Sequence, residues 1–176
     1  GQPSCTGVTR ALAMMLSGKQ SSTNSSSGIA WLDALCSTGI GYSFTQVFKF
    51  AGATGASDAF VVGHELGHNF GSPHTHCYSP AIDNCYNAEG GCFSGTTSCP
   101  AATTINGVTN VRGTLMSYCH VLGGCSASQV FHPRTVNEQV GPLIQSSVGT
   151  CIFPFDPFAA GFRDGFESGL VPPWSG

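Results

Sequence analysis

Charged side chains are scarce in this sequence. Of 176 residues, 6 are Lys or Arg and 9 are Asp or Glu, so that 9% are charged, against roughly 25% in an average soluble domain. Six cations are too few to build the basic surface that nucleic acid or an anionic membrane requires. The sequence also lacks an apolar run of the roughly 20 residues that a membrane-spanning helix needs. We therefore expect no nucleic-acid partner and no membrane span. The hydrophobic content of 41% predicts one folded domain with a core.

Paired C-x-x-C ligands, which a zinc-thiolate protein needs, are also absent, although the chain has nine cysteines. Dispersed cysteines, low charge and abundant Gly, Ser and Thr favour an exported, disulfide-linked protein, so we expect a secreted, extracellular location. An odd number leaves one cysteine without a partner in this chain. The chain begins with Gly1 and has no signal peptide, so we expect a processed or truncated piece.

Short apolar segments predict strands at 8–16, 29–35 and 42–50, and Ser17-Gly18 is the expected end of the first. A helix should follow, with Ser57 or Asp58 as its N-cap and an end near Phe70. Its apolar stripe recurs every fourth residue, at Val62, Leu66 and Phe70. Gly71 supplies a left-handed stop.

The rest of the chain has little periodicity. Residues 72–122 carry many Gly and Thr and most of the cysteines, which predicts an irregular region held by disulfides. Pro133 can open a last helix, and Pro142 predicts a kink or break in it. The composition shifts after Cys151, so we interpret residues 1–153 as one folded domain and 154–176 as a tail or linker.

Residues 64–74 read HELGHNFGSPH. Two histidines four residues apart, His64 and His68, lie one above the other on a helix, so both can reach one zinc at about 2.0–2.1 Å. Glu65 is displaced around the helix and can take the proton of a zinc-bound water. Gly71 permits a sharp turn that returns His74 as a third ligand. Three ligands leave a fourth position open, which is typical of a catalytic zinc site.

A second signal is the run Thr114-Leu115-Met116-Ser117-Tyr118, about 40 residues further on. Alone, Met116 would be interpreted as core filler. After the long histidine motif, a Met in a tight turn at this distance is the metzincin pattern.

With these motifs the chain resembles the metzincin clan of zinc endopeptidases, most closely bacterial relatives of the adamalysin (reprolysin) family, over roughly residues 8–152. The resemblance implies an α/β (α+β) catalytic domain. Its upper part has a twisted sheet and the active-site helix, and its lower part is irregular and disulfide-held, with His74, the Met-turn and a C-terminal helix. An extended substrate would pair with an edge strand, for which 28–35 is the candidate.

The sequence departs from the family pattern in three places. Thr75 stands where adamalysins usually have Asp, and His76 then becomes a rival third ligand, although its spacing fits the turn less well than that of His74. Tyr118 follows Met116 by two residues, as in astacin- and serralysin-like enzymes, where such a Tyr can approach the zinc. It is a possible catalytic residue, and a packed aromatic is the alternative. Only 63 residues precede His64, fewer than is usual in the family, so the first strands and helices are expected to be missing.

The resemblance also implies part of the cysteine pairing. Cys36 and Cys151 match the family's long-range bridge. Six cysteines are left for three local bridges with 15 possible connectivities, and Cys5 is the odd one. The six are Cys77, Cys85, Cys92, Cys99, Cys119 and Cys125.

The resulting hypothesis is a secreted, monomeric zinc endopeptidase that acts on a protein or peptide substrate, with one catalytic Zn²⁺. Glu65 takes the proton of the zinc-bound water and passes it to the leaving amine. Two alternatives stay open: a catalytically silent binding module with the same fold, and an inactive fragment of such an enzyme. Calcium is also left open, since so few acidic residues make a multi-carboxylate site hard to assemble.

Overall fold

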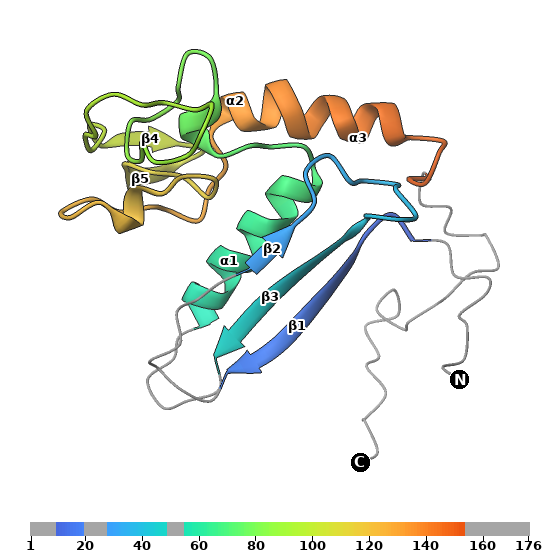
Figure 1. Cartoon of the computed structure of the whole chain (residues 1–176). Coiled ribbons are helices and arrows are strands. Elements are labelled where there is room, and N and C mark those ends of the chain that lie inside the picture. The colour runs from blue at the N-terminus through green and yellow to red at the C-terminus, as the bar shows by residue number, and fades with distance from the viewer. Residues whose placement is uncertain (1–9, 20–27, 49–54, 154–176) are drawn as a thin grey trace.

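A computed structural model describes residues 10–19, 28–48 and 55–153 (Figure 1). A three-stranded sheet lies against a long helix, α1, and a loop-rich region follows α1. The predicted mixed α/β class is confirmed. Cys5, residues 8–9 and 49–50 of the expected strands and the expected tail at 154–176 lie outside the described residues.

The sheet has the order β1-β3-β2, with β1 (Ala13–Lys19) parallel to β3 (Tyr42–Phe48) and β2 (Gly28–Ala30) antiparallel to it. The predicted end of the first strand at Ser17-Gly18 is wrong, because both residues continue to pair with β3. Backbone pairing along a neighbouring strand overrides the weak strand propensity of Ser and Gly.

The predicted strand at 29–35 is also too long, since pairing stops at Ala30. The backbone N–H groups of Asp33, Ala34 and Leu35 donate instead to the carbonyls of His68 and Asn69, which end α1. The last carbonyls of a helix have no hydrogen-bond partner within the helix. The segment at 33–35 donates hydrogen bonds to these carbonyls and therefore does not pair with a neighbouring strand. The buried Asn69 side chain strengthens the junction by donating to the carbonyls of Trp31 and Tyr42.

Helix α1 runs from Gly55 to Asn69. It begins before the predicted caps, so Ser57 and Asp58 lie within its first turn. Gly71 has φ of +87° and ends the helix as predicted. The turn brings the chain back toward α1, and with it His74, which follows Gly71 by three residues.

The region after α1 is largely irregular, with 3₁₀ turns at Thr75–Cys77 and Cys119–Val121. It also contains a hairpin of β4 (Thr103–Ile105) and β5 (Val108–Val111), which the sequence analysis missed. Asn106 and Gly107 form its turn with φ of 49° and 80°, and an Asn-Gly pair is a strong hairpin signal. Three disulfides crosslink the region: Cys77–Cys92, Cys85–Cys119 and Cys99–Cys125.

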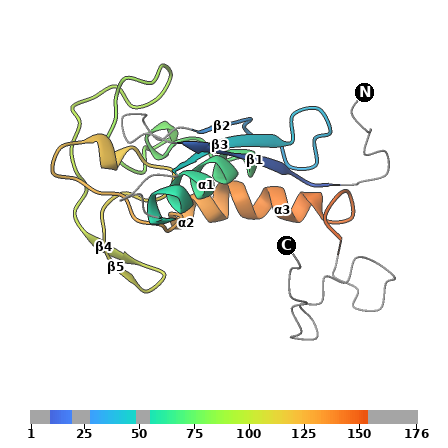
Figure 2. The same cartoon turned by 90° about the horizontal axis from the view of Figure 1, so that it is seen from below.

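The last helix combines α2 (Pro133–Thr135), a π-helical segment at Val136–Val140 and α3 (Gly141–Ser147). Pro142 predicts a kink or break, and the helix continues past it without a break. A wider turn precedes the proline, and the N–H of Gly141 bonds the carbonyl of Val136, five residues back. Figure 2 shows this helix from below. A further disulfide joins Cys36, after β2, to Cys151, after α3.

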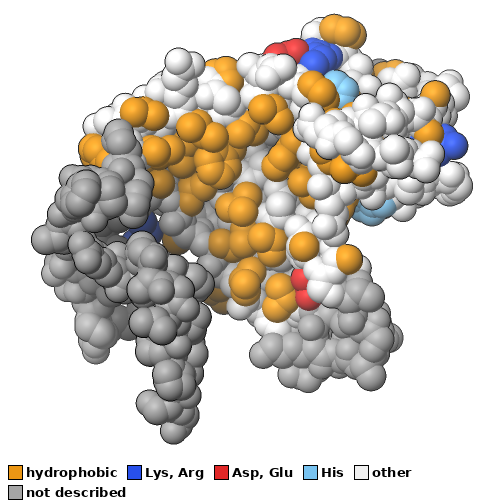
Figure 3. All heavy atoms as spheres, turned by 180° about the vertical axis from the view of Figure 1, so that it is seen from behind, with side chains coloured by type: hydrophobic (Ala, Val, Ile, Leu, Met, Phe, Trp, Pro, Cys, Tyr) orange, Lys and Arg blue, Asp and Glu red, His pale blue; other side chains and the backbone are white. Residues whose placement is uncertain are grey.

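Apolar side chains cover much of the middle of the face opposite to that of Figure 1, with few charged side chains between them (Figure 3). This agrees with the low charge content of the chain.

Candidate metal centre

Three histidines converge at the C-terminal half of α1. His64 and His68 lie one turn apart on the helix, and the turn at Gly71 returns His74 to them. The Nε2 atom of His64 lies 3.1 Å from that of His68 and 3.2 Å from that of His74, and the Nε2 atoms of His68 and His74 are 3.1 Å apart. The three nitrogens therefore form a nearly equilateral triangle.

The other ring nitrogen of each histidine has a hydrogen-bond acceptor. Nδ1 of His64 donates to the carbonyl of Leu115 at 2.7 Å, and Nδ1 of His68 donates to the carbonyl of Ser72 at 2.8 Å. Nδ1 of His74 donates to Oε2 of Glu89 at 2.7 Å. Because these acceptors carry no proton, Nδ1 holds the proton in each ring. Three Nε2 lone pairs then face one another, an arrangement that needs a cation between them.

A zinc ion fits this donor set. Tetrahedral bonds of about 2.0–2.1 Å place ligand atoms about 3.3–3.4 Å apart, close to the spacing of the three nitrogens. Burial lowers the pKa of His64 and His68 to about 4, and it also lowers the pKa of His74. The imidazoles are thus neutral near pH 7, which is the form that binds a metal.

Glu65 follows His64 on α1, lines the same pocket as His64 and is 5% exposed. Burial raises its pKa to about 7. The edge strand β2 runs directly against it, since a Cβ atom on Gly28 would overlap Cγ and Oε1 of Glu65. A glycine at the start of β2 therefore allows the strand and the carboxyl group to lie together.

The rival ligand His76 points elsewhere. It is fully buried, and its Nε2 atom lies 2.9 Å from Oε2 of Glu89. The group formed by His64, His68 and His74 does not include it. The structure thus brings His74 to the other two histidines and places His76 behind Glu89.

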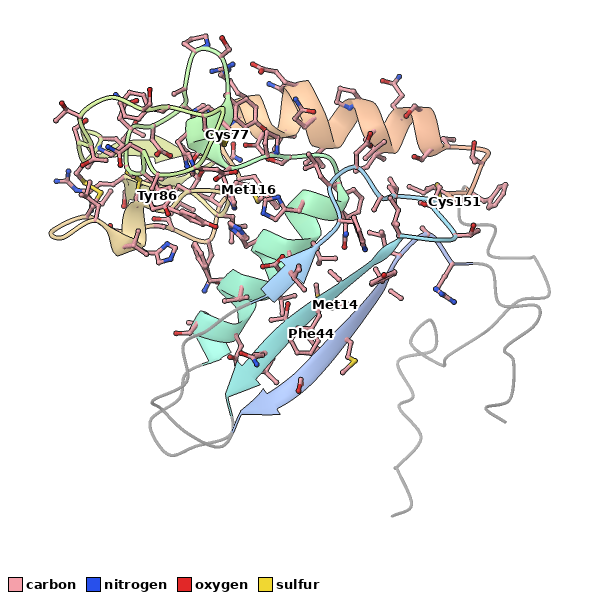
Figure 4. All side chains as sticks on the ribbon, in the orientation of Figure 1. Met14, Phe44, Cys77, Tyr86, Met116 and Cys151 are labelled. Carbon is pink, nitrogen blue, oxygen red and sulfur yellow. A yellow bond between two sulfur atoms is a disulfide. The ribbon has the colours of Figure 1, made fainter. Side chains whose placement is uncertain are left out.

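The Met-turn packs against α1 at the turn of the helix between His64 and His68. Met116 is fully buried, and a Cβ atom on Gly67 would overlap its Sδ atom. The preceding residue, Leu115, supplies the carbonyl that fixes His64. In Figure 4, Met116 lies between α1 and the loop-rich region. The turn therefore packs against α1 and orients one of its histidines.

A family model described as metallo-peptidase family M12, of the reprolysin type, matches residues 6–125 of the chain. The chain belongs to this family. The predicted metzincin resemblance, most like the reprolysins, is confirmed. No curated protein and no solved structure matches the chain. Membership places the domain, at the level of its family, among the metallopeptidases, which are hydrolases that use a metal and act on protein or peptide. Among the described residues, no helix is long and apolar enough to cross a membrane.

A pocket of about 450 Å³ adjoins the metal centre of this M12 domain. Tyr118 forms part of its wall, and its ring centroid lies 4.3 Å from that of His74 and 6.0 Å from that of His64. Burial raises the pKa of Tyr118, so its hydroxyl is protonated and can donate a hydrogen bond. The other walls are mostly aromatic or apolar, formed by Phe60, Val61, Tyr86, His120 and Val121.

Three residues at the site were not found from the sequence. Tyr86, which is labelled in Figure 4, has its ring centroid 5.0 Å from that of Tyr118. His120 lines the pocket, and Glu89 accepts a hydrogen bond from His74. All three come from irregular segments that have no motif. Acidic residues are scarce in the chain, but Asp83 also lies between Cys77 and Cys92, so the sequence did not single out Glu89.

Proposed function

We propose that this M12 domain is a secreted zinc endopeptidase, with one zinc held by His64, His68 and His74 and with Glu65 as general base. One observation carries the proposal: three unprotonated Nε2 atoms lie 3.1–3.2 Å apart beside a buried carboxyl group. A silent binding module would not need that carboxyl group. Secretion is supported by the four disulfides of the described residues.

When bound, zinc supplies Lewis acidity, which lowers the pKa of a coordinated water toward about 7 and polarises a carbonyl. The side chains of the domain do the rest. Glu65 accepts the proton of the attacking water and transfers it to the leaving nitrogen. Tyr118 donates a hydrogen bond to the oxygen on which negative charge develops. The Met-turn keeps His64 in place through the Leu115 carbonyl.

The substrate would be an extended peptide that pairs with β2. This strand has β3 on one side, and within the described part of the sheet its other edge is free. Addition of a peptide strand supplies main-chain hydrogen bonds, and pockets select the side chains. The adjacent pocket has mostly apolar and aromatic walls, so we expect a preference for an apolar side chain next to the cleaved bond.

The test measures zinc content and cleavage of an unfolded protein, with and without a chelator. We expect one zinc per chain and a loss of cleavage on chelation. His74→Ala should sharply weaken zinc binding because it removes a ligand, whereas His76→Ala leaves the three Nε2 atoms in place and should weaken it much less. A chain without zinc, or the reverse order of the two variants, would contradict the proposal.

A further inference from the structure

A carboxylate lies directly behind the third histidine. Oε2 of Glu89 is 2.7 Å from Nδ1 of His74 and 2.9 Å from Nε2 of His76. The two imidazole rings are stacked, with their planes 10° apart and their centroids separated by 5.4 Å. One oxygen atom thus receives two N–H donors from residues on either side of Thr75.

The loop that carries Glu89 is anchored at both ends. The Cys77–Cys92 disulfide closes it. The N–H of Ile82 bonds the carbonyl of Thr75, and the N–H of Phe93 bonds the carbonyl of His76. These contacts hold the loop to the segment that contains His74, so the fold sets the backbone position of Glu89, and the hydrogen bonds from His74 and His76 hold its side chain.

His74 differs in this respect from the other two histidines. Nδ1 of His64 and Nδ1 of His68 donate to backbone carbonyls. Nδ1 of His74 donates to a carboxylate, and a hydrogen bond to a charged acceptor is stronger than one to a neutral acceptor. His74 also comes from an irregular segment, outside α1, so no helix fixes the direction of its ring. A strong hydrogen bond compensates for that.

We propose that Glu89 is the positioning residue of the third metal ligand. It fixes the tautomer and ring direction of His74 and makes Nε2 a better donor, as a carboxylate behind a metal-binding histidine does. His76 supports Glu89 from the other side. This inference rests on the proposed zinc site at His64, His68 and His74.

The experiment compares the zinc affinity of the full 176-residue chain and four variants by competition with a chromogenic chelator. We expect Glu89→Ala to weaken zinc binding about 10–100-fold, the usual effect of losing such a partner. Glu89→Gln keeps the shape of the side chain and one hydrogen-bond acceptor but not the charge. Its zinc affinity should therefore lie between those of the parent and Glu89→Ala. The control is Glu138→Gln, which removes a carboxylate paired with Arg134 on the last helix. His74→Ala is the reference for a lost ligand.

A measurement with cobalt(II) distinguishes a positioning role of Glu89 from a general disturbance of the loop that carries it. The visible absorption of cobalt(II) bound at the centre reports how well its ligands donate, so Glu89→Gln should change it and Glu138→Gln should not. Disulfide mapping of each variant verifies that Cys77–Cys92 has formed.

The outcomes distinguish the two proposals. If His74→Ala weakens zinc binding while both Glu89 variants bind zinc and cobalt(II) like the parent, the role of Glu89 is refuted and the zinc site stands. If His74→Ala binds zinc like the parent, the zinc site itself is wrong, and the role of Glu89 is refuted with it.

Discussion

At the scale of single residues, two carboxyl groups near the metal centre have opposite surroundings. Glu65 is buried, and burial raises its pKa to about 7. For Glu89 desolvation also acts to raise the pKa, but hydrogen bonds from His74 and His76 outweigh it and leave the pKa below its ordinary value. Glu65 can therefore exchange a proton near neutral pH, while Glu89 stays ionised. The surroundings of Glu65 thus suit a general base, and those of Glu89 suit a permanently charged hydrogen-bond acceptor.

The first prediction at this scale concerns Glu65. Glu65→Gln should keep zinc bound, since its side chain is no ligand, and should lower the rate of peptide cleavage by about 10²–10⁴-fold. Gln is nearly isosteric with Glu but cannot accept the proton. The measurement is zinc content together with kcat, and Glu138→Gln serves as the distant control. A Glu65→Gln variant that binds zinc and cleaves at nearly the parent rate would refute this mechanism and direct attention to Tyr118 or His76.

Residues of the site differ in how far the sequence could predict them. His64, Glu65, His68 and His74 could be placed together because helix periodicity and one glycine turn are local features. Glu89 and Tyr86 could not, because their positions depend on a loop whose course is set by disulfides. Local patterns carry no information about such a course.

At the scale of elements, the sequence predicted α1 and its end well but placed strand limits poorly. Ala34 and Leu35 are apolar, yet the segment at 33–35 leaves the sheet and donates hydrogen bonds to the last carbonyls of α1. That partner is more than 30 residues away, so no local pattern could reveal it. The hairpin at β4 and β5 is different, because its Asn106-Gly107 turn was a readable local signal.

The close contact between β2 and α1 leads to a second prediction. Gly28→Ala places a Cβ atom where Glu65 lies, so we expect the carboxyl group to move and kcat to fall by about 10²-fold, the cost of a small misplacement of a catalytic group. Zinc affinity should hardly change, because the three atoms nearest to the added Cβ all belong to Glu65, which is not one of the three histidines.

The matched control is Gly39→Ala, since a Cβ atom at Gly39 meets nothing within 4 Å. Kinetics and zinc titration of both variants provide the comparison. Equal kcat values for Gly28→Ala and Gly39→Ala would show that β2 does not determine where Glu65 lies.

At the scale of the whole molecule, the disulfides divide into two kinds. Cys36–Cys151 spans 115 residues and ties the turn after β2 to the end of the last helix, whereas the other three close segments of 15–34 residues within the loop-rich region. Family resemblance could imply the long bridge, but the pairing of the other six cysteines required the folded course of the chain. Many connectivities are compatible with the same spacing.

The two kinds of bridge should have separable effects. In the chain-entropy model, losing the long bridge through Cys36→Ala with Cys151→Ala costs about 4–5 kcal/mol of unfolding free energy, and losing the short one through Cys77→Ala with Cys92→Ala costs about 3 kcal/mol.

Zinc affinity should fall more when the short bridge is lost than when the long bridge is lost. The short bridge closes the loop that holds Glu89 against His74, whereas the long bridge lies away from the three histidines. Denaturant unfolding in the presence of chelator measures the first quantity, and chelator competition on the folded chain measures the second. Equal losses of zinc affinity in the two double variants would show that the Glu89 loop is not held locally, and a larger loss from removing Cys36 and Cys151 would place the control of the third ligand in the sheet.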